Sequence, residues 1–201
     1  MNIYGDQAQY LPLILTDLED RLTDLNQAQP TKLYEHLIGR VKAEPSMIEK
    51  CHRKGYPVTA HSALRECKDA IAIRLVCRFI EDVYTTVAVL KQLDWAQVVT
   101  EKDYIKNAKP NGYRSYHLIL AVTTPYPDVD GHTPGQYFVE IQLRTIAMDS
   151  WASLEHELKY KQNIDHPERI AKELQRCAEE LAACDLQMQT IRHLIHQDEE
   201  A

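Results

Sequence analysis

The sequence predicts an α/β fold, a β-sheet flanked by helices, on three observations. Residues 69–79 form an apolar run typical of a covered strand, and residues 80–93 follow with a helical pattern. Residues 116–123 and 136–144 show the alternation of two further strands. Amphipathic patterns near both ends of the chain predict an N-terminal and a C-terminal helix.

The first helix is expected from Gln9 to Leu25, because apolar residues recur there in steps of four and three. These residues are Leu11, Leu15, Leu18, Leu22 and Leu25. After Pro30 we expect a short helical stretch. A further helix is expected from about Pro45 to about Gly55, because proline suits the first turn of a helix.

The middle of the chain predicts strands and loops. Residues 97–100 have the pattern of a short strand, and residues 104–114 contain the turn signal Lys109-Pro110-Asn111-Gly112, typical of a polar loop. The strands 116–123 and 136–144 are separated by a segment rich in proline and aspartate, so we expect them to form a hairpin.

Two helices are expected to complete the chain, at residues 146–161 and 167–196. The second has an apolar heptad series, which favours packing of the helix against a partner. The series is Ile170, Leu174, Cys177, Leu181, Cys184, Met188, Ile191 and Ile195.

Length and composition describe one globular domain. The 201 residues are 44% hydrophobic and 26% charged, without an apolar run long enough for a membrane span. We therefore expect a single domain over 1–201, with an N-terminal helix in 1–30, a core in 31–161 and a C-terminal helix in 162–201. The first residues lack the pattern of a secretion signal, so we expect a cytoplasmic protein. The five cysteines contain no Cys-x-x-Cys pair, which predicts free thiols.

Cations gather in two segments of an acidic chain. The net charge of −7 argues against a surface devoted to nucleic acid. Between Arg40 and Lys54, however, basic residues outnumber acidic ones, and a second basic stretch runs from Lys102 to Arg114. We interpret the two segments as parts of a polyphosphate pocket.

The last predicted strand has a polar face. Alternation sends Glu140, Gln142 and Arg144 to one side, opposite apolar side chains. A carboxylate, an amide and a guanidinium in a row would suit a cleft over the sheet. The alternative is an edge strand with a solvated face.

The helix after Pro45 would place Ser46, Lys50 and Arg53 on one face, where they would suit phosphate oxygens. The alternative is a basic face that is merely solvated. Asp69 and Glu140 offer the hard oxygen ligands that Mg²⁺ prefers.

Asp69 raises a geometric difficulty. It lies five residues before Arg74, so a regular pleat would place the two on opposite faces unless Asp69 precedes the pleat or a bulge intervenes. A capping aspartate and a surface arginine are the alternative.

The loop before His117 suits a nucleotide base, because Gly112 permits close backbone approach and an exposed Tyr113 would stack on a purine. The alternative is a simple turn that enters a strand. The chain has neither a Gly-x-x-x-x-Gly-Lys-[Ser/Thr] loop nor a Gly-x-Gly-x-x-Gly motif, which disfavours the common nucleotide-binding folds.

Five motifs, in the same order along the chain, resemble the RelA/SpoT-type (p)ppGpp synthetases. They are Arg40-x-Lys42-x-x-x-Ser46-x-x-Glu49-Lys50, Asp69-x-x-Ala72-x-Arg74, Lys109-x-Asn111-Gly112-Tyr113-x-Ser115-x-His117, Glu140-x-Gln142-x-Arg144-Thr145, and Met148-x-x-Trp151-Ala152-x-x-Glu155-His156 with Tyr160 and Lys161. The resemblance covers about residues 33–161, and the chain most resembles the short, stand-alone, RelQ-like small alarmone synthetases.

The resemblance implies a mixed sheet of the nucleotidyltransferase-like synthetase fold. It implies a GTP diphosphokinase of the stringent response, which transfers the β,γ-pyrophosphate of ATP to the 3′-hydroxyl of GDP or GTP. Asp69 would bind Mg²⁺, and Glu140 would share the metal or take the proton from the 3′-hydroxyl. The residues implied for ATP are Arg40, Lys42, Ser46, Lys50, Arg53 and Arg74, with Arg40 and Arg74 around the adenine. The residues implied for GDP or GTP are Lys109, Asn111, Tyr113, His117, Gln142, Arg144 and His156, with Tyr113 stacked on the guanine.

One departure bears on regulation. The branch of this family that its product activates has a Phe-x-Thr stretch before the Gly-Arg pair and an asparagine in the later helix, whereas this chain has His36, Ile38 and Asp149. We expect weak or absent product activation, since an aromatic ring and a hydroxyl are lost and a carboxylate is added.

The resemblance also suggests a homotetramer, for which the first and last helices offer surfaces; packing of both helices within one subunit is the alternative. We expect at most weak binding of single-stranded RNA. Two rival functions stay open: a toxic relative that makes (p)ppApp or pyrophosphorylates tRNA, and a catalytically silent nucleotide- or RNA-binding regulator.

Overall fold

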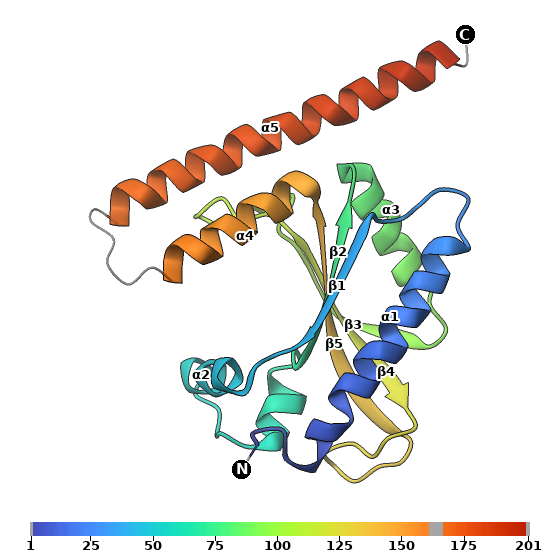
Figure 1. The fold of residues 1–201 in the computed structure, drawn as a ribbon, viewed down its shortest axis with the longest axis vertical. Coiled ribbons are helices and arrows are strands. Elements are labelled where there is room, and N and C mark those ends of the chain that lie inside the picture. The colour runs from blue at the N-terminus through green and yellow to red at the C-terminus, as the bar shows by residue number, and fades with distance from the viewer. Residues whose placement is uncertain (1, 161–166, 200–201) are drawn as a thin grey trace.

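A single five-stranded sheet forms the centre of the computed structural model, which describes residues 2–160 and 167–199 (Figure 1). Its strands are β1 (His36–Val41), β2 (Ile71–Cys77), β3 (Ala96–Asp103), β4 (Tyr116–Thr124) and β5 (Gly135–Thr145), in the spatial order β1-β2-β5-β4-β3. Strands β2 and β5 are parallel and the other neighbours are antiparallel. The sheet is therefore mixed, and the predicted hairpin of β4 and β5 is confirmed.

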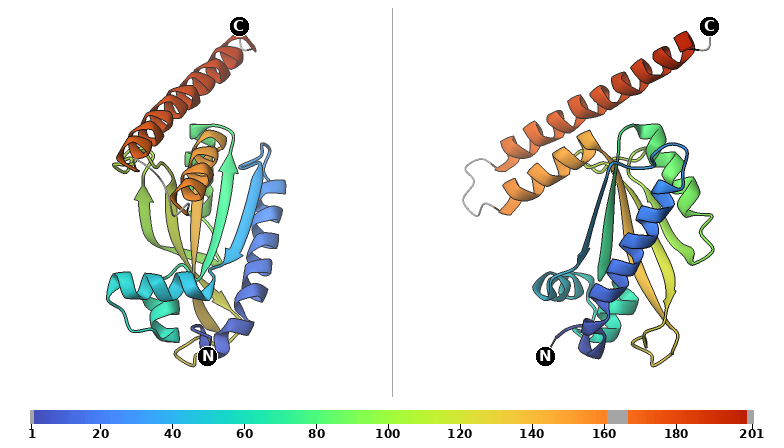
Figure 2. Two further views of the ribbon diagram at one scale, coloured as in Figure 1. Left: turned by 60° about the vertical axis from the view of Figure 1, so that its left-hand side comes forward. Right: turned by 45° about the vertical axis from the view of Figure 1, so that its right-hand side comes forward.

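Helices flank the sheet on both sides. They are α1 (Leu11–Gln27), α2 (Glu44–Lys54), α3 (Ile80–Leu90), α4 (Ile146–Tyr160) and α5 (Pro167–Glu199), with the short helical turns η1 (Gly5–Gln9) and η2 (Ser62–Glu66). Helices α1 and α3 cover one face, whereas α2 and α4 lie on the other side, near opposite ends of the strands (Figures 1 and 2). Helix α5 runs beside α4 and extends beyond the sheet (Figure 2).

The prediction of a helical stretch after Pro30 is wrong. The chain is irregular there and enters strand β1 at His36. Tertiary contacts decide this conformation: the Asn26 side chain accepts a hydrogen bond from the Leu33 amide at 2.7 Å, and the Glu35 amide donates to the Val76 carbonyl at 2.8 Å. Strand β1 lies at the sheet edge and alternates only between exposed and half-buried positions, so its sequence pattern is weak.

Helix α1 packs closely over β1, and Gly39 permits the approach. A β-carbon at Gly39 would lie 2.2 Å from Glu19 Oε1 and 2.7 Å from Leu15 Cδ1. The apolar stripe of α1 is buried within the subunit at Leu11, Ile14, Leu18 and Leu22. The contact holds β1 in place, and with it Arg40 in this strand and Lys42 directly after it.

Helix α2 forms as predicted, with Pro45 in its first turn and Gly55 just beyond its end. Met47 and Cys51 are fully buried, which anchors the helix through its apolar side. The opposite side therefore presents Ser46, Lys50 and Arg53.

Helix α5 packs through only part of the predicted heptad series: Leu174 and Leu181 are half-buried against the cluster that contains Trp151. Ala178, Asp185 and Gln189 are buried, whereas Met188, Ile191 and Ile195 of the series are about half exposed. Asp185 accepts a hydrogen bond from the buried Thr145 hydroxyl at 2.6 Å, which ties α5 to the end of β5. Polar as well as apolar contacts thus set the rotation of this helix.

Within the described part of the chain, none of the helices is both long enough and apolar enough to span a bilayer.

Candidate functional site

A polar surface crosses four strands on one face of the sheet. Val139, Ile141 and Leu143 of β5 are buried on the opposite face, so the even-numbered Glu140 and Gln142 face the site. The remaining strands add to this surface because β2 places Arg74 beside Gln142, β4 places His117 beside Gln142, and β1 places Arg40 beside Ala72. Strand β5 is central, so the interpretation of its polar face as a solvated sheet edge is wrong.

Asp69 is a buried carboxylate held by two lysines. It precedes β2, which begins at Ile71, so the regular pleat does not constrain its direction. Its Oδ2 atom accepts from Lys42 Nζ at 2.5 Å and from Lys50 Nζ at 2.7 Å. Its Oδ1 atom is buried without a hydrogen-bond partner among the described residues. An unpaired buried carboxylate oxygen is costly and is suited to a cation.

A basic pocket of about 390 Å³ lies between α2 and α4. We call it the basic pocket, and its lining includes five of the six residues implied for ATP. The lining residues are Arg40, Val41, Lys42, Ala43, Ser46, Glu49, Lys50, Arg53 and His156. His156, which the resemblance implies for the other nucleotide, thus lies with the predicted ATP residues. This density of cations suits a polyphosphate.

A second pocket of about 410 Å³, the central pocket, adjoins the first because Lys50 lines both. It contains Asp69 and Glu140 together with His117 and Lys109. Its other lining residues are Lys54, Tyr56, Glu66, Cys67, Lys68, Thr100, Lys102, Tyr104 and Ile119. The two carboxylates predicted to meet therefore face one cavity, next to the basic pocket.

Sequence reasoning did not name seven polar residues of the central pocket as site residues: Lys54, Tyr56, Glu66, Lys68, Thr100, Lys102 and Tyr104. The basic stretches that contain Lys54 and Lys102 were the available signal. Lys68 and Tyr104 lie outside the regular strands and helices, so no periodic sequence pattern could assign them to the cavity.

Five side chains form a closed ring of hydrogen bonds, of which His117 and Glu140 line the central pocket. Arg144 Nη2 donates to the Tyr113 hydroxyl at 2.9 Å and to Gln142 Oε1 at 3.1 Å. The Tyr113 hydroxyl contacts His117 Nε2 at 2.9 Å, and His117 Nδ1 contacts Glu140 Oε1 at 3.2 Å. Gln142 Nε2 donates to Glu140 Oε2 at 2.7 Å, which closes the ring.

The two ends of this ring have fixed roles, because a guanidinium only donates and a carboxylate only accepts. Along one branch Arg144 donates to Tyr113, the Tyr113 hydroxyl and His117 Nε2 form the next hydrogen bond, and Nδ1–H of His117 donates to Glu140. Glu140 is thus the acceptor at which both branches end.

Glu140 is ionised at neutral pH. Burial alone would raise the pKa of its carboxyl, but the interactions with His117, then with Gln142 and Lys50, lower this pKa to about 2. The effect of Lys50 shows that its ammonium acts on Glu140 as well as on Asp69. The Lys50 ammonium therefore interacts electrostatically with both carboxylates.

Asp149 of α4 holds two arginines from different strands. Its Oδ1 atom accepts from Arg74 Nη1 and from Arg144 Nη1, each at 3.0 Å. Burial, and then the charge of Arg144, lower the pKa of the Arg74 guanidinium, whereas Asp149 raises it. Asp149 therefore compensates for two like charges placed close together.

The loop before β4 is braced from α4. Asn111 Nδ2 donates to Glu155 Oε1 at 3.1 Å, and Asn111 Oδ1 accepts from the Tyr113 amide at 3.2 Å. Lys109 Nζ lies 4.5 Å from the centre of the Tyr113 ring. Asn111 thus orders the loop that presents Tyr113 and Lys109.

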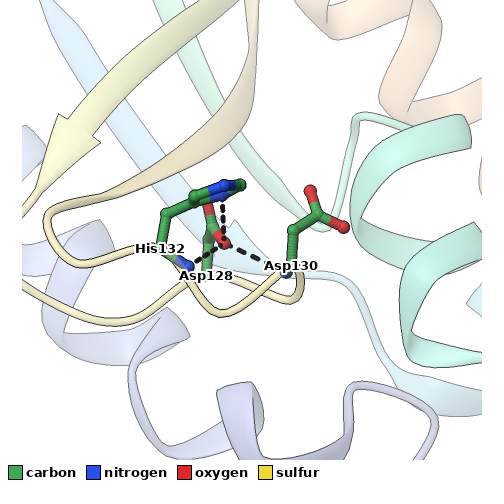
Figure 3. Close-up of side chains that lie close together, drawn as sticks. All are labelled: Asp128, Asp130 and His132. Atoms are coloured by element: carbon green, nitrogen blue, oxygen red, sulfur yellow. Dashed lines mark hydrogen bonds and ion pairs between the residues drawn. The ribbon is translucent and has the colours of Figure 1, made fainter.

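Among the described residues, one acidic group has the spacing of a metal site: Asp128, Asp130 and His132 in the β4–β5 loop (Figure 3). Their potential ligand atoms lie within 4.8 Å of one another. However, Asp128 already accepts from the backbone amides of Asp130, His132 and Gln136 and from Arg65. These bonds give Asp128 a structural role in the loop, so the cluster is a weaker candidate than the Asp69 region.

Two cationic pockets that meet at buried carboxylates on a mixed sheet define an α/β protein that binds polyphosphates. The comparisons identify the family. Residues 39–165 match the model of the region found in RelA / SpoT proteins, and the chain belongs to the RelA/SpoT family.

Two curated relatives come from Bacillus subtilis (strain 168). GTP pyrophosphokinase YwaC is 43% identical over 145 residues, which span 72% of this chain and 67% of YwaC. GTP pyrophosphokinase YjbM is 37% identical over 158 residues, which span 79% of this chain and 72% of YjbM.

The crystal structure of small alarmone synthetase 1 from B. subtilis superimposes with a TM-score of 0.82 at 32% identity, covering 93% of this chain and 94% of that chain. The same synthetase bound to its product pppGpp gives a TM-score of 0.79 at 32% identity, with 95% of each chain covered. Bound to AMPCPP, it gives 0.71 at 30% identity, over 97% of this chain and 95% of that chain.

Proposed function

We propose that this chain is a GTP pyrophosphokinase, which transfers the β,γ-pyrophosphate of ATP to the 3′-hydroxyl of GDP or GTP and so makes (p)ppGpp. The observation that carries the proposal is the pair of cationic pockets that share Lys50 and meet at Asp69 and Glu140. Relatives named GTP pyrophosphokinases, 37% and 43% identical, support the same activity.

The basic pocket is the proposed ATP site. Lys42, Ser46, Lys50 and Arg53 supply the ammonium, hydroxyl and guanidinium groups that bind phosphate oxygens. Arg40 also lines this pocket, and Arg74 lies one strand further in, close enough for the two guanidiniums to interact electrostatically. We assign the adenine to these two arginines, whose planar groups stack on flat bases.

The central pocket is the proposed site of GDP or GTP. Tyr113 offers a ring for the guanine, and Lys109, which now lies over that ring, is a flexible cation able to turn to a phosphate. His117 and Arg144 contact the Tyr113 hydroxyl, and Gln142 accepts from Arg144. Asn111 acts by ordering the loop, and His156 contributes from the basic pocket.

Mg²⁺ fits Asp69 and Glu140. The unpaired Oδ1 of Asp69 and the ionised Glu140 face one cavity beside the proposed triphosphate site, and Mg²⁺ typically takes one or two carboxylates plus phosphates. When bound, the ion neutralises charge on the transferred group. An ionised Glu140 can share the metal or take the proton from the 3′-hydroxyl.

Labelled ATP, incubated separately with GDP, GTP, ATP and tRNA and followed by thin-layer separation, tests the proposal. We expect label on GDP and GTP, and a loss of about a thousandfold or more in the Glu140→Gln variant. Glu157→Gln, an exposed position on α4, serves as the matched control. Label on tRNA or ATP alone would indicate the toxic relative, and no transfer to any acceptor would indicate the silent regulator.

We further propose that the whole chain acts as one synthetase unit that forms a homotetramer. Leu186, Met188, Ile191, Leu194 and Ile195 of α5 are each about half exposed or more, an apolar strip unusual for an isolated helix surface. The stripe of α1, by contrast, is used inside the subunit. Light scattering reports the mass directly. At most weak binding of single-stranded RNA stays a prediction.

A further inference from the structure

Asp149 differs from the other acidic residues of the cleft in its partners. One oxygen of its carboxylate, Oδ1, accepts hydrogen bonds from Arg74 on β2 and from Arg144 on β5 at 3.0 Å each. Its side chain is only 18% exposed, and it lies in the first turn of α4, immediately after β5. It is therefore held in place by the end of the sheet and not by a mobile loop.

The two arginines interact with different parts of the site. Arg74 faces Arg40, whose charge acts on it, and Arg40 lines the basic pocket. Arg144 reaches the hydroxyl of Tyr113 at 2.9 Å, and Tyr113 continues to His117 in the central pocket. Asp149 thus lies at the junction of the groups that we assign to the two bases.

Electrostatics makes this junction dependent on the carboxylate. The guanidiniums of Arg74 and Arg144 are like charges held at one carboxylate oxygen, so they repel each other, and each has a buried Nε without a hydrogen-bond partner among the described residues. Without a shared anion the two groups would move apart toward solvent. Arg144 would then release the Tyr113 hydroxyl, and the ring of Tyr113 would lose its fixed orientation.

We propose that Asp149 is a positioning residue that orients Arg74 directly and Tyr113 through Arg144, so that a single carboxylate aligns the platforms for both nucleotide bases. The identity of the bases rests on the proposed function. The bases lie far from the transferred group, so this alignment strengthens binding of both substrates and changes the chemical step little.

An inhibitory role of Asp149 would have the opposite effect on nucleotide affinity. If Asp149 were an internal anion that competes with nucleotide phosphates for the arginines, its removal would tighten binding. The positioning role predicts weaker binding of both nucleotides together, because Arg74 is influenced by Arg40 of the basic pocket, whereas Arg144 is linked through Tyr113 to His117 of the central pocket.

Steady-state kinetics and calorimetric binding of AMPCPP and GDP test the proposal on Asp149→Ala and Asp149→Asn. We expect Asp149→Ala to raise the KM of ATP and of GDP by about tenfold each, with kcat within about threefold. Asp149→Asn retains an acceptor oxygen, so it should recover part of this loss, to about threefold. Glu157→Ala, an exposed substitution on the same helix, is the control for effects on α4.

An unchanged or lowered KM for both nucleotides in Asp149→Ala, or a change for only one of them, would overturn the proposal. A thermal melt of each variant shows whether it is folded. If Asp149→Ala is unfolded, the KM values of Asp149→Asn test the proposal instead. The binding data stand apart from the transfer reaction: a parent that binds both nucleotides but transfers nothing refutes the proposed function, and a fall of both affinities in Asp149→Ala would still support the positioning role.

Discussion

The carboxylates of this protein have different roles because their neighbours differ. Asp69 keeps one oxygen unpaired while two lysines hold the other, and Glu140 accepts from an imidazole and an amide. Asp149 bridges two guanidiniums, and Asp128 accepts from backbone amides and Arg65. An unpaired buried oxygen in a cavity, such as Oδ1 of Asp69, indicates a ligand site.

Asp128 is expected to stabilise the fold in a pH-dependent manner. Burial alone would raise its pKa, but hydrogen bonds from Gln136, His132, Asp130 and Arg65 outweigh burial and lower it. A folded-state pKa below the unfolded value of about 3.9 gives stability that is present above that pH and is lost as the pH falls through the folded-state pKa.

We therefore expect Asp128→Asn to lower the free energy of unfolding by about 1–3 kcal/mol at pH 7, with a smaller difference from the parent below about pH 4. Urea unfolding at pH 7 and at pH 3 measures this. Equal stability of parent and variant at pH 7 would show that the loop does not depend on this charge.

At the scale of elements, the cleft depends on two close contacts between helices and the backbone. Helix α1 packs against Gly39 of β1, and helix α5 packs against Gly112 of the loop before β4. At Gly112 φ is +90°, and a β-carbon would lie 2.6 Å from the β-carbon of Ala178. The loop that presents Tyr113 is thus shaped by the last helix.

We expect Gly112→Ala to raise the KM of GDP about tenfold and to leave the KM of ATP nearly unchanged, because the displaced loop belongs to the central pocket. Gly131→Ala is the matched control: φ there is +87°, and no described heavy atom lies within 4 Å of the added carbon beyond its chain neighbours. If the two substitutions changed the KM of GDP equally, the contact between Gly112 and α5 would not explain the effect.

Most elements of the fold could be predicted from the sequence, and the exceptions have physical causes. The patterns of α1, α2 and the β4–β5 hairpin are strong, because each buries one regular side. Strand β1 was missed because an edge strand with a half-exposed pattern gives little local signal. The predicted series gave the packing face of α5 only near Leu174 and Leu181, because Asp185 and Gln189, both polar, are buried further along the helix.

The site was predictable in part. Alternation along β5 placed Glu140 and Gln142 on the cleft face, and helical spacing grouped Ser46, Lys50 and Arg53. The hydrogen-bond ring and the bridging role of Asp149 were not predictable, because they join residues from strands, a loop and a helix whose proximity only the tertiary structure provides.

For the whole molecule, regulation by the product is expected to be weak. His36 and Ile38 are exposed on β1 and offer neither the aromatic ring nor the hydroxyl of the product-activated branch, and Asp149 is held by arginines. Added pppGpp should change the initial rate of synthesis by less than about twofold. Stimulation of about fivefold or more would contradict this expectation.

The central claim is that Asp69 and Glu140 share a divalent ion beside the triphosphate site. Electron paramagnetic resonance of Mn²⁺, a stand-in for Mg²⁺, in the presence of AMPCPP tests this claim directly on the parent and on the Asp69→Asn, Glu140→Gln and Asp128→Asn variants. We predict that Asp69→Asn and Glu140→Gln each weaken Mn²⁺ binding about tenfold or more, whereas Asp128→Asn leaves it unchanged. Loss of binding in Asp128→Asn alone, with the other two variants like the parent, would contradict the account.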